Sequence, residues 1–243
     1  MLVLHGFTET DLFWGDLLGS LGPSNQGVTA CGLLPGHGWK PCADGTTLAS
    51  AAADFAKRLP ADGGDLLGYS LGGRLALQLA LDHPKRVRRL VLVSCMAGIR
   101  DQAERSRRRE RDERLAQILE EDGIGPFLAL WEANPVLKTI KPIPHHIEET
   151  LRSMRMNQDP LGLASALRTL GVGTMQDLWP RLPAITAKTL LIAGDHDTRY
   201  VQAMGEMAKL IPGARFEVVA DSGHAVHREQ PYVLKKLVSA FLA

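Results

Sequence analysis

The sequence predicts an α/β fold, in which a mostly parallel sheet is flanked by helices and a helical cap is inserted into the chain. Short apolar runs alternate with helical patterns over residues 1–99 and 181–243, which is typical of a parallel sheet covered on both faces. The intervening segment, 100–180, contains helical patterns but no convincing strand. The chain has 243 residues, of which 45% are hydrophobic and 23% charged, and this suits one large domain rather than two independent cores.

The individual elements follow from the positions of these patterns. The first expected strand, 2–4, ends at His5-Gly6, and because the chain starts at this strand the N-terminal edge strands of such folds are expected to be shortened or missing. The segment 100–180 is interrupted by glycine and proline, and we expect it to cover the C-terminal edge of the sheet, where ligands bind in open α/β folds. Further strands are expected at 27–31, 65–69, 90–94, 189–193 and 216–219, and helices at 46–59, 71–82, 200–210 and 232–242.

Composition and charge exclude several classes of protein. The net charge is +1, from 28 basic and 27 acidic residues, which argues against a general nucleic-acid binder. No apolar run is long enough to span a bilayer, and the N-terminus lacks the features of a signal peptide, so a cytoplasmic protein without membrane partners is expected. Three cysteines are too few for a disulfide framework or a zinc cage. A monomer or weak homo-oligomer acting on a small molecule is the starting hypothesis.

The most informative motif is Gly68-Tyr69-Ser70-Leu71-Gly72, which matches the pattern G-x-S-x-G. It follows an expected strand and opens a helix pattern, as a nucleophile elbow does. The small residues permit a tight strand–turn–helix that exposes the Ser70 hydroxyl, and the helix N-terminus offers N–H groups to a developing negative charge. Taken alone, the motif is explained about equally well by a serine N-cap.

Two later loops favour catalysis over the N-cap. Gly194-Asp195-His196-Asp197 and Ser222-Gly223-His224 each follow an expected strand. The order Ser, Asp, His is the one used by α/β-hydrolases, so a triad of Ser70, Asp197 and His224 is predicted. Asp195 is the alternative acid, but Asp197 lies further from the strand and can turn toward His224, whereas Asp195 is expected to be a turn residue.

The loop after the first strand, His5-Gly6-Phe7, completes the expected catalytic site. The backbone N–H of Phe7 can act as an oxyanion donor beside that of Leu71. The other histidines show no spacing typical of a metal site, and neither a metal nor an organic cofactor is expected. His227 is expected to cap or pack near the last helix, and the others to be ordinary loop or surface residues: His37, His83, His145, His146 and His196.

Arginines narrow the expected substrate. Arg74 lies one helical turn after Ser70, so it can hold an anionic group beside the nucleophile, although a surface salt bridge is the alternative. The segment 100–114 contains seven arginines and five acidic residues, most of which are expected on a solvated helix face. Arg155 and Trp131 stand elsewhere in the helical insertion and could reach the same cavity. Arginine is well shaped to bind carboxylates in a bidentate manner.

The quoted motifs resemble the 2-succinyl-6-hydroxy-2,4-cyclohexadiene-1-carboxylate synthase family of menaquinone (vitamin K2) biosynthesis, a branch of the α/β-hydrolases. The resemblance covers nearly the whole chain, and its most specific part is Ser-Leu-Gly-Gly-Arg at 70–74 together with the arginines of the cap. Further matching segments are Leu34-Pro35-Gly36-His37-Gly38, Asn134-Pro135-Val136, Met154-Arg155-Met156-Asn157 and Gly223-His224-Ala225-Val226-His227-Arg228-Glu229.

This resemblance implies a lyase that eliminates pyruvate from a cyclohexene polycarboxylate, with the triad abstracting a ring proton. It also implies a set of substrate-binding residues, in which Arg108 is preferred over its neighbours because it falls four residues before Asp112: Tyr69, Arg74, Arg108, Trp131 and Arg155. A serine esterase, thioesterase or carbon–carbon bond hydrolase with the same triad is the alternative enzyme. A binding protein on a hydrolase scaffold is a third hypothesis, which the intact Ser, His and Asp disfavour.

Overall fold

The computed structural model describes residues 1–12, 14 and 30–243. Within these residues, six strands form one sheet in the order β2-β1-β3-β4-β5-β6, and all five pairings are parallel. The strands are β1 (Leu2–Leu4), β2 (Ala30–Gly32), β3 (Gly64–Tyr69), β4 (Val87–Val93), β5 (Lys188–Gly194) and β6 (Arg215–Val219). Because the chain places β2 on one side of β1 and β3 on the other, the strand order reverses at β1, and a ligand crevice is expected beside the carboxyl ends of β1 and β3.

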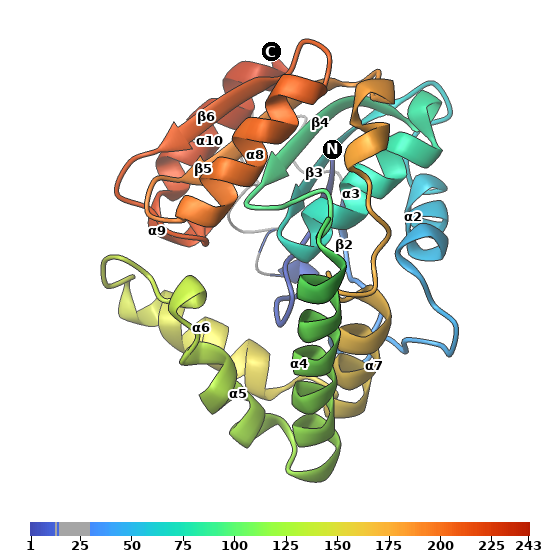
Figure 1. Cartoon of the computed structure of the whole chain (residues 1–243). Coiled ribbons are helices and arrows are strands. Elements are labelled where there is room, and N and C mark those ends of the chain that lie inside the picture. The colour runs from blue at the N-terminus through green and yellow to red at the C-terminus, as the bar shows by residue number, and fades with distance from the viewer. Residues whose placement is uncertain (13, 15–29) are drawn as a thin grey trace.

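Helices cover both faces of the sheet, as the alternation of patterns predicted (Figure 1). The helices that alternate with the strands are α2 (Leu48–Ala56), α3 (Leu71–Asp82) and α8 (Thr198–Leu210), and α9 (Val226–Glu229) and α10 (Pro231–Leu242) follow β6. Successive strand residues point to opposite faces, so each strand serves two cores. In β3, for example, Leu66 belongs to the cluster with α2, α3 and α8, whereas Leu67 belongs to the cluster with α10.

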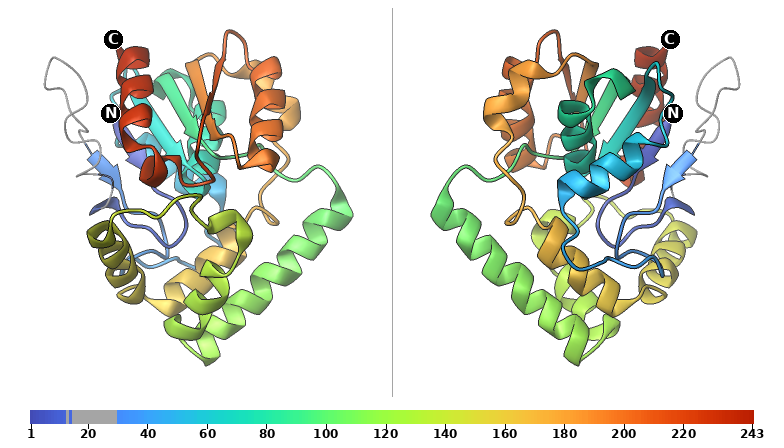
Figure 2. Two further views of the ribbon diagram at one scale, coloured as in Figure 1. Left: turned by 90° about the vertical axis from the view of Figure 1, so that its left-hand side faces the viewer. Right: turned by 90° about the vertical axis from the view of Figure 1, so that its right-hand side faces the viewer.

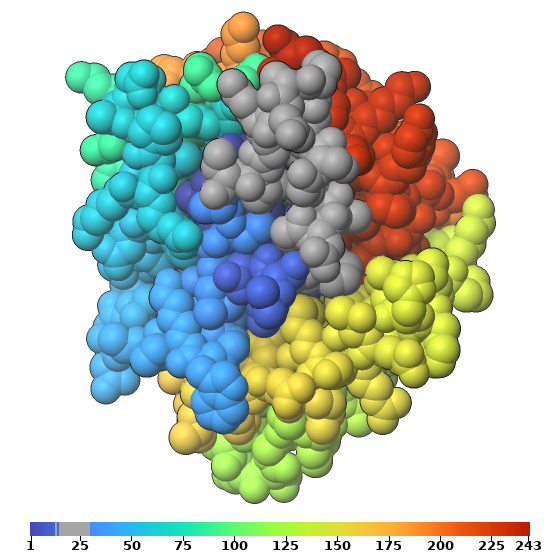
Figure 3. Space-filling view, turned by 180° about the vertical axis from the view of Figure 1, so that it is seen from behind, coloured from blue at the N-terminus to red at the C-terminus, as the bar shows by residue number. Residues whose placement is uncertain are grey.

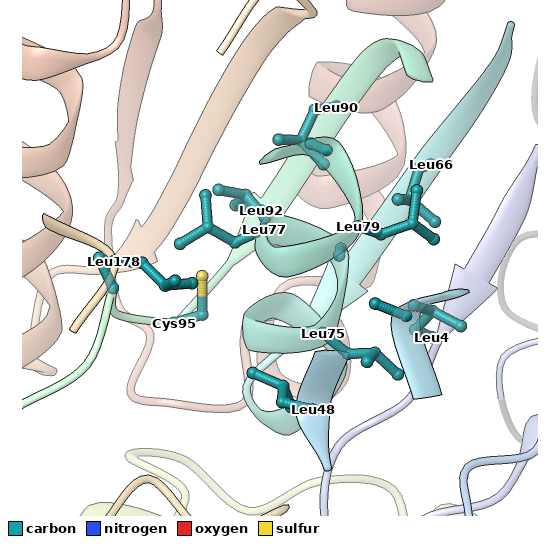
Figure 4. Packing of buried hydrophobic residues seen from close by; sticks show 14 of the residues in the cluster. Leu4, Leu48, Leu66, Leu75, Leu77, Leu79, Leu90, Leu92, Cys95 and Leu178 are labelled. Carbon is teal, nitrogen blue, oxygen red and sulfur yellow. The ribbon is translucent and has the colours of Figure 1, made fainter. Parts of the chain in front are cut away.

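Helix α3 packs along the sheet through a row of leucines. Leu75, Leu77 and Leu79 are fully buried, and Figure 4 shows them against strand side chains such as Leu66 and Leu90. Complete burial of one leucine side chain contributes about 1.5–3 kcal/mol to the free energy of folding. This packing holds the first turn of α3, and therefore Ser70, at a fixed place above the sheet.

The predicted element boundaries agree with the observed ones to within three residues, and the differences have local reasons. The helix predicted at 46–59 begins at Leu48 because Thr47 is its N-cap: the Thr47 hydroxyl accepts from the backbone N–H of Ser50, whose side chain accepts from that of Thr47. Strand β4 begins three residues earlier than predicted, at Val87, because the exposed Arg88 and partly exposed Arg89 interrupt the apolar run. Of the strand predicted at 27–31, positions 27–29 lie outside the described residues.

Four helices, with no strand among them, lie between β4 and β5: α4 (Gln102–Glu121), α5 (Ile124–Glu132), α6 (His145–Met156) and α7 (Pro160–Leu170). They form a separate layer on one side of the molecule, with α4 as the longest element (Figures 1 and 2). Figure 3 shows the yellow segment that contains α6 and α7 against the blue N-terminal part of the chain. Their own apolar cluster includes Phe127 and Leu163, and Phe7 of the core packs against it.

None of the described helices combines the length and the apolar composition needed to cross a bilayer.

Candidate active site

Ser70 stands at a sharp turn between β3 and α3. Its backbone has φ 50° and ψ −108°, a conformation that is strained for a residue with a side chain. The turn is possible because glycines stand two residues before and two residues after Ser70. A Cβ on Gly68 would lie 2.3 Å from the carbonyl oxygen of Gly72, and one on Gly72 would lie 2.2 Å from that of Leu4. The Ser70 hydroxyl has no capping bond to the helix, so the N-cap interpretation of the motif does not apply.

His224 lies between Ser70 and Asp197 in the structure. Its Nε2 is 3.1 Å from Ser70 Oγ, and its Nδ1 is 2.7 Å from Asp197 Oδ2. An ionised carboxylate accepts only, so Nδ1 carries the hydrogen and Nε2 is left to accept a proton from the serine. The side chains of His224 and Asp197 are only 4% and 5% exposed, which keeps water from competing for this contact.

Asp195, the alternative acid, points elsewhere. Its Oδ1 accepts from the backbone N–H of Ser222 at 3.1 Å, so it ties the loop after β5 to the loop after β6. The backbone N–H of His196 donates to the carbonyl of Ser222 across the same two loops. These contacts give Asp195 the turn role that was expected, and they also fix the loop that carries His224.

Phe7 lies in the loop after β1, and Leu71 directly follows Ser70. Their backbone N–H groups donate to no acceptor among the described residues. The two segments are tied together, because the N–H of Gly72 donates to the carbonyl of His5 at 3.0 Å. Side chains of the helical layer close over this loop: the Phe7 ring lies 5.1 Å from that of Trp131 and 6.3 Å from that of Phe127. Both N–H groups are therefore available to an oxyanion beside Ser70.

His37 was expected to be an ordinary loop or surface residue, and this is wrong, because it is completely buried under the β1 loop. Its ring packs edge-on against His5 and Phe7, and its Nδ1 lies 3.0 Å from the carbonyl of Pro35. Burial, together with the nearby His5, lowers the pKa of His37 to about 3. His5 itself accepts from the N–H of Leu34 through Nε2, so its Nδ1 donates to the Gly6 carbonyl, and the neutral ring joins the two loops.

A cavity adjoins Ser70 and His224 and is lined by residues of both the core and the helical layer. All five predicted substrate-binding side chains line it: Tyr69, Arg74, Arg108, Trp131 and Arg155. Arg74 is held by a 2.7 Å hydrogen bond to the carbonyl of Leu170, and burial with the nearby Arg108 lowers its pKa to about 10, so it stays charged at neutral pH.

Arg108 is oriented by Asp112, whose two carboxylate oxygens accept from Nε at 2.9 and 3.0 Å. Burial raises the pKa of Asp112, and the charge of Arg108 opposes that effect. Since this ion pair uses Nε, the terminal nitrogens of Arg108 remain available to a ligand in the cavity. The spacing of four residues that favoured Arg108 is thus the spacing of an intrahelical ion pair.

Tyr69 and Arg155 also line this cavity. Tyr69 is buried, its ring lies 5.5 Å from His224, and burial raises the pKa of its hydroxyl. Arg155 donates to Glu132 at 2.7 Å, and its Nε has no hydrogen-bond partner among the described residues. Burial and then the positive charge of Arg228 lower the pKa of Arg155.

Sequence reasoning missed a buried group behind the site, in which Glu9 is central. Glu9 accepts from the Trp14 indole at 2.9 Å and from the backbone N–H of Gly6 at 3.3 Å, and it lies 2.9 Å from Nε2 of His227. Arg228 is 3.8 Å away and lines the cavity. An acidic residue three positions after His5-Gly6, with a histidine three positions after His224, is the only signal of this group in the sequence.

The arrangement can take a proton from a bound molecule or attack it through Ser70, and it can stabilise negative charge on an adjacent oxygen. In the described part of the chain, no three histidine, cysteine or acidic side chains are grouped so that they could hold a metal ion. The arginines that line the cavity, among them Arg74, Arg108 and Arg155, favour an anionic ligand.

Comparison with known proteins places this geometry in a family. A model of the alpha/beta hydrolase family matches residues 1–234. The chain is 34% identical to a Bacillus subtilis (strain 168) protein that is named as a 2-succinyl-6-hydroxy-2,4-cyclohexadiene-1-carboxylate synthase, with 100% of this chain and 89% of that protein covered. An Enterobacter sp. (strain 638) protein of the same name is 26% identical, with 100% and 91% covered.

Solved structures agree with these relatives. The structure of MenH from S. aureus is 30% identical, with a TM-score of 0.90 over 99% of this chain and 92% of that one. A thermophilic esterase from Thermogutta terrifontis, solved with malate bound, is 27% identical, with a TM-score of 0.83 over 99% and 88%. One fold therefore serves both a protein of the MenH kind and an esterase.

Proposed function

The chain belongs to the α/β-hydrolase family, with relatives named as 2-succinyl-6-hydroxy-2,4-cyclohexadiene-1-carboxylate synthases along its whole length, and from this premise we propose that it catalyses their reaction. It is a carbon–oxygen lyase of menaquinone biosynthesis. Its substrate is 2-succinyl-5-enolpyruvyl-6-hydroxy-3-cyclohexene-1-carboxylate, and its products are the 2,4-cyclohexadiene and pyruvate.

The positions of the double bonds in substrate and product define the reaction. A base removes the proton from C2, the ring carbon that bears the succinyl carbonyl. The electron pair forms the C2–C3 double bond, the original C3–C4 double bond moves to C4–C5, and the bond from C5 to the enolpyruvyl oxygen breaks. The leaving enolpyruvate takes up a proton and becomes pyruvate. No external water, oxidant or reductant enters the balance.

Ser70 is the base in this proposal. His224 takes the hydroxyl proton through Nε2, so that Ser70 Oγ carries alkoxide character as it removes the C2 proton. Asp197 keeps His224 in the tautomer that can do so and stabilises the imidazolium. The 3.1 Å and 2.7 Å contacts of this chain of residues support these roles.

Negative charge develops on the succinyl carbonyl as the C2 proton leaves. The N–H groups of Phe7 and Leu71 bind that oxygen, and each donor contributes about 2.7–4 kcal/mol in comparable sites. The loop contact between Gly72 and His5 keeps the two donors together, so little reorganisation accompanies the reaction.

The observation that carries the proposal is the set of arginines around this one cavity. The substrate has three carboxylates, on the ring, on the succinyl chain and on the enolpyruvyl group, whereas a simple ester has none. Arg74 from the core and Arg108 and Arg155 from segment 100–180 bind these groups, with Tyr69 and Trp131 packing beside them. We propose that this segment acts as a cap domain over the core formed by 1–99 and 181–243.

Ester hydrolysis is the second candidate, because the similarity to the Thermogutta terrifontis esterase and the same serine–histidine contact favour it. The test is to incubate the purified protein with the enolpyruvyl substrate and to measure pyruvate release, beside a panel of 4-nitrophenyl esters. Pyruvate release at a kcat/KM far above that for any ester is expected. Efficient ester hydrolysis without pyruvate release would contradict the proposal in favour of the esterase.

A further inference from the structure

Arg228 is the least explained charged residue around the cavity. It lies on α9, four residues after His224, and its side chain is only 5% exposed. Its nearest acid is Glu9 at 3.8 Å, too far for a hydrogen bond, and its Nε has no hydrogen-bond partner among the described residues. The Tyr69 hydroxyl interacts with this guanidinium, but no carboxylate among the described residues does so at hydrogen-bond distance. A buried guanidinium without a carboxylate partner is costly unless a ligand supplies one.

The surroundings keep Arg228 charged in spite of this burial. Burial lowers its pKa, but Tyr69 and Glu9 raise it by more, so the net direction is upward. Glu9 is already engaged by three other groups, namely Trp14, His227 and the backbone of Gly6. Its carboxylate therefore stabilises the charge of Arg228 at a distance and leaves Nε of Arg228 for another acceptor.

Arg155 lies on the same wall. Its side chain is 11% exposed, its Nη1 donates to Glu132, and its Nε is also without a hydrogen-bond partner among the described residues. Arg155 and Arg228 each line the cavity beside Ser70 and also a second cavity further out, together with Trp131 and Leu137. Three glutamates also line the second cavity and offset the positive charge of its arginines: Glu132, Glu148 and Glu149.

We propose that Arg228 is a further substrate-binding residue. Together with Arg155 and Tyr69 it binds one carboxylate of the substrate, at the boundary between the two cavities. Arg74 and Arg108 then serve the carboxylates nearer to α3 and α4. The identity of the anion rests on the proposed function, whereas the carboxylate site itself rests on the two unpartnered guanidinium nitrogens.

The experiment compares wild type with Arg228→Gln, Arg228→Lys and a control, Arg152→Gln, which removes an arginine that lines only the outer cavity. Succinate binding is measured by titration calorimetry, and kcat/KM is measured for pyruvate release and for 4-nitrophenyl acetate. Arg228→Gln is expected to weaken succinate binding and pyruvate release by about 10- to 150-fold, the effect of losing a charged hydrogen bond. Hydrolysis of the neutral ester should change less than twofold, and Arg152→Gln should behave as wild type.

Arg228→Lys keeps the charge beside Glu9 but not the bidentate geometry, so it should fold and show a smaller loss; it replaces Arg228→Gln if that variant does not fold. Unchanged succinate binding in a folded variant, an equal loss on the neutral ester, or no succinate binding by wild type would overturn the inference. Wild type that binds succinate through Arg228 but releases no pyruvate would contradict the proposed function alone. Pyruvate release that is independent of Arg228 would overturn the inference alone.

Discussion

The carboxylate of Asp197 reaches Nδ1 of His224 at 2.7 Å, although the two residues come from loops after different strands. Strands β5 and β6 are parallel neighbours, so their carboxyl ends open at the same edge of the sheet. Asp197 also sits at the N-terminal boundary of α8, where its backbone position is fixed by the helix that follows. This explains why Asp197, two residues beyond Asp195, is the carboxylate that reaches His224.

Asp197→Asn should reduce kcat for pyruvate release by on the order of 10⁴-fold, because the amide leaves the geometry in place but holds His224 in the wrong tautomer. Asp195→Asn should cost far less, since the Asp195 carboxylate accepts from the backbone of the next loop and not from His224. The two variants are compared by kcat at matched melting temperature. A greater loss for Asp195→Asn would contradict the choice of acid.

Ser70→Ala and His224→Ala should each abolish most pyruvate release while the fold remains intact. Their 3.1 Å contact makes them one functional unit, so the double variant should be little worse than either single one. The loss in kcat is expected to be at least as large as that for Asp197→Asn, on the order of 10⁴- to 10⁶-fold. Near-normal turnover by either variant, with a wild-type circular dichroism spectrum, would show that the base is another group.

The sheet, its flanking helices and the order of the catalytic loops could be predicted from the sequence, because apolar periodicity and G-x-S-x-G are local signals. Ser70 and Gly72 illustrate this: the close approach of Gly72 to the β1 backbone is what the glycine of the motif permits. The catalytic roles of these residues stay predictions. The ends of helices and strands were harder to predict from the sequence. Thr47 sets a helix start by capping and the exposed Arg88 lies inside a strand, and apolar periodicity marks neither of them.

The residues that were missed act across long stretches of chain. Glu9 meets His227 over 218 positions, and no local pattern marks an acid that is buried by such a contact. His37 was misplaced for a similar reason: a glycine- and proline-rich loop suggests exposure, but His5 and Phe7 cover it. In both cases the deciding term is tertiary burial, which single-sequence reasoning does not supply.

Acid should destabilise the protein well above the range in which carboxylates titrate. The folded-state pKa of His37 is about 3, below the unfolded value of about 6.5, so below pH 6.5 the unfolded chain binds a proton that the folded chain does not. The resulting stability is present above pH 6.5 and is lost as the pH falls, by about 1.4 kcal/mol per pH unit for this group. His5 and His227, whose pKa values burial also lowers, add to the slope.

Urea unfolding between pH 7.5 and 5 measures this slope in wild type and in His37→Phe, which should be flatter by about 1.4 kcal/mol per pH unit below pH 6. His146→Gln is the matched control, because His146 is exposed on α6, and it should keep the wild-type slope. If His37→Phe kept the full slope, His37 would take up its proton in the folded state.

Arginine substitutions separate the two enzymatic hypotheses. For the tricarboxylate substrate, Arg74→Ala, Arg108→Ala and Arg155→Ala should each lower kcat/KM, because a lost charged hydrogen bond costs about 1.5–3 kcal/mol, or about 10- to 150-fold. A neutral 4-nitrophenyl ester makes no such contact, so its hydrolysis should barely respond. Loss of Arg74 should be the most costly of the three, since the core helix α3 holds it and the Leu170 carbonyl orients it, whereas Arg108 and Arg155 stand on helices outside the sheet layer.

Arg181→Ala, which removes only an ion pair with Asp82, is the control for general destabilisation. Equal losses on both substrates would point to structural roles for these arginines, and insensitivity of the anionic substrate to all three would remove the reason to prefer pyruvate elimination over ester hydrolysis.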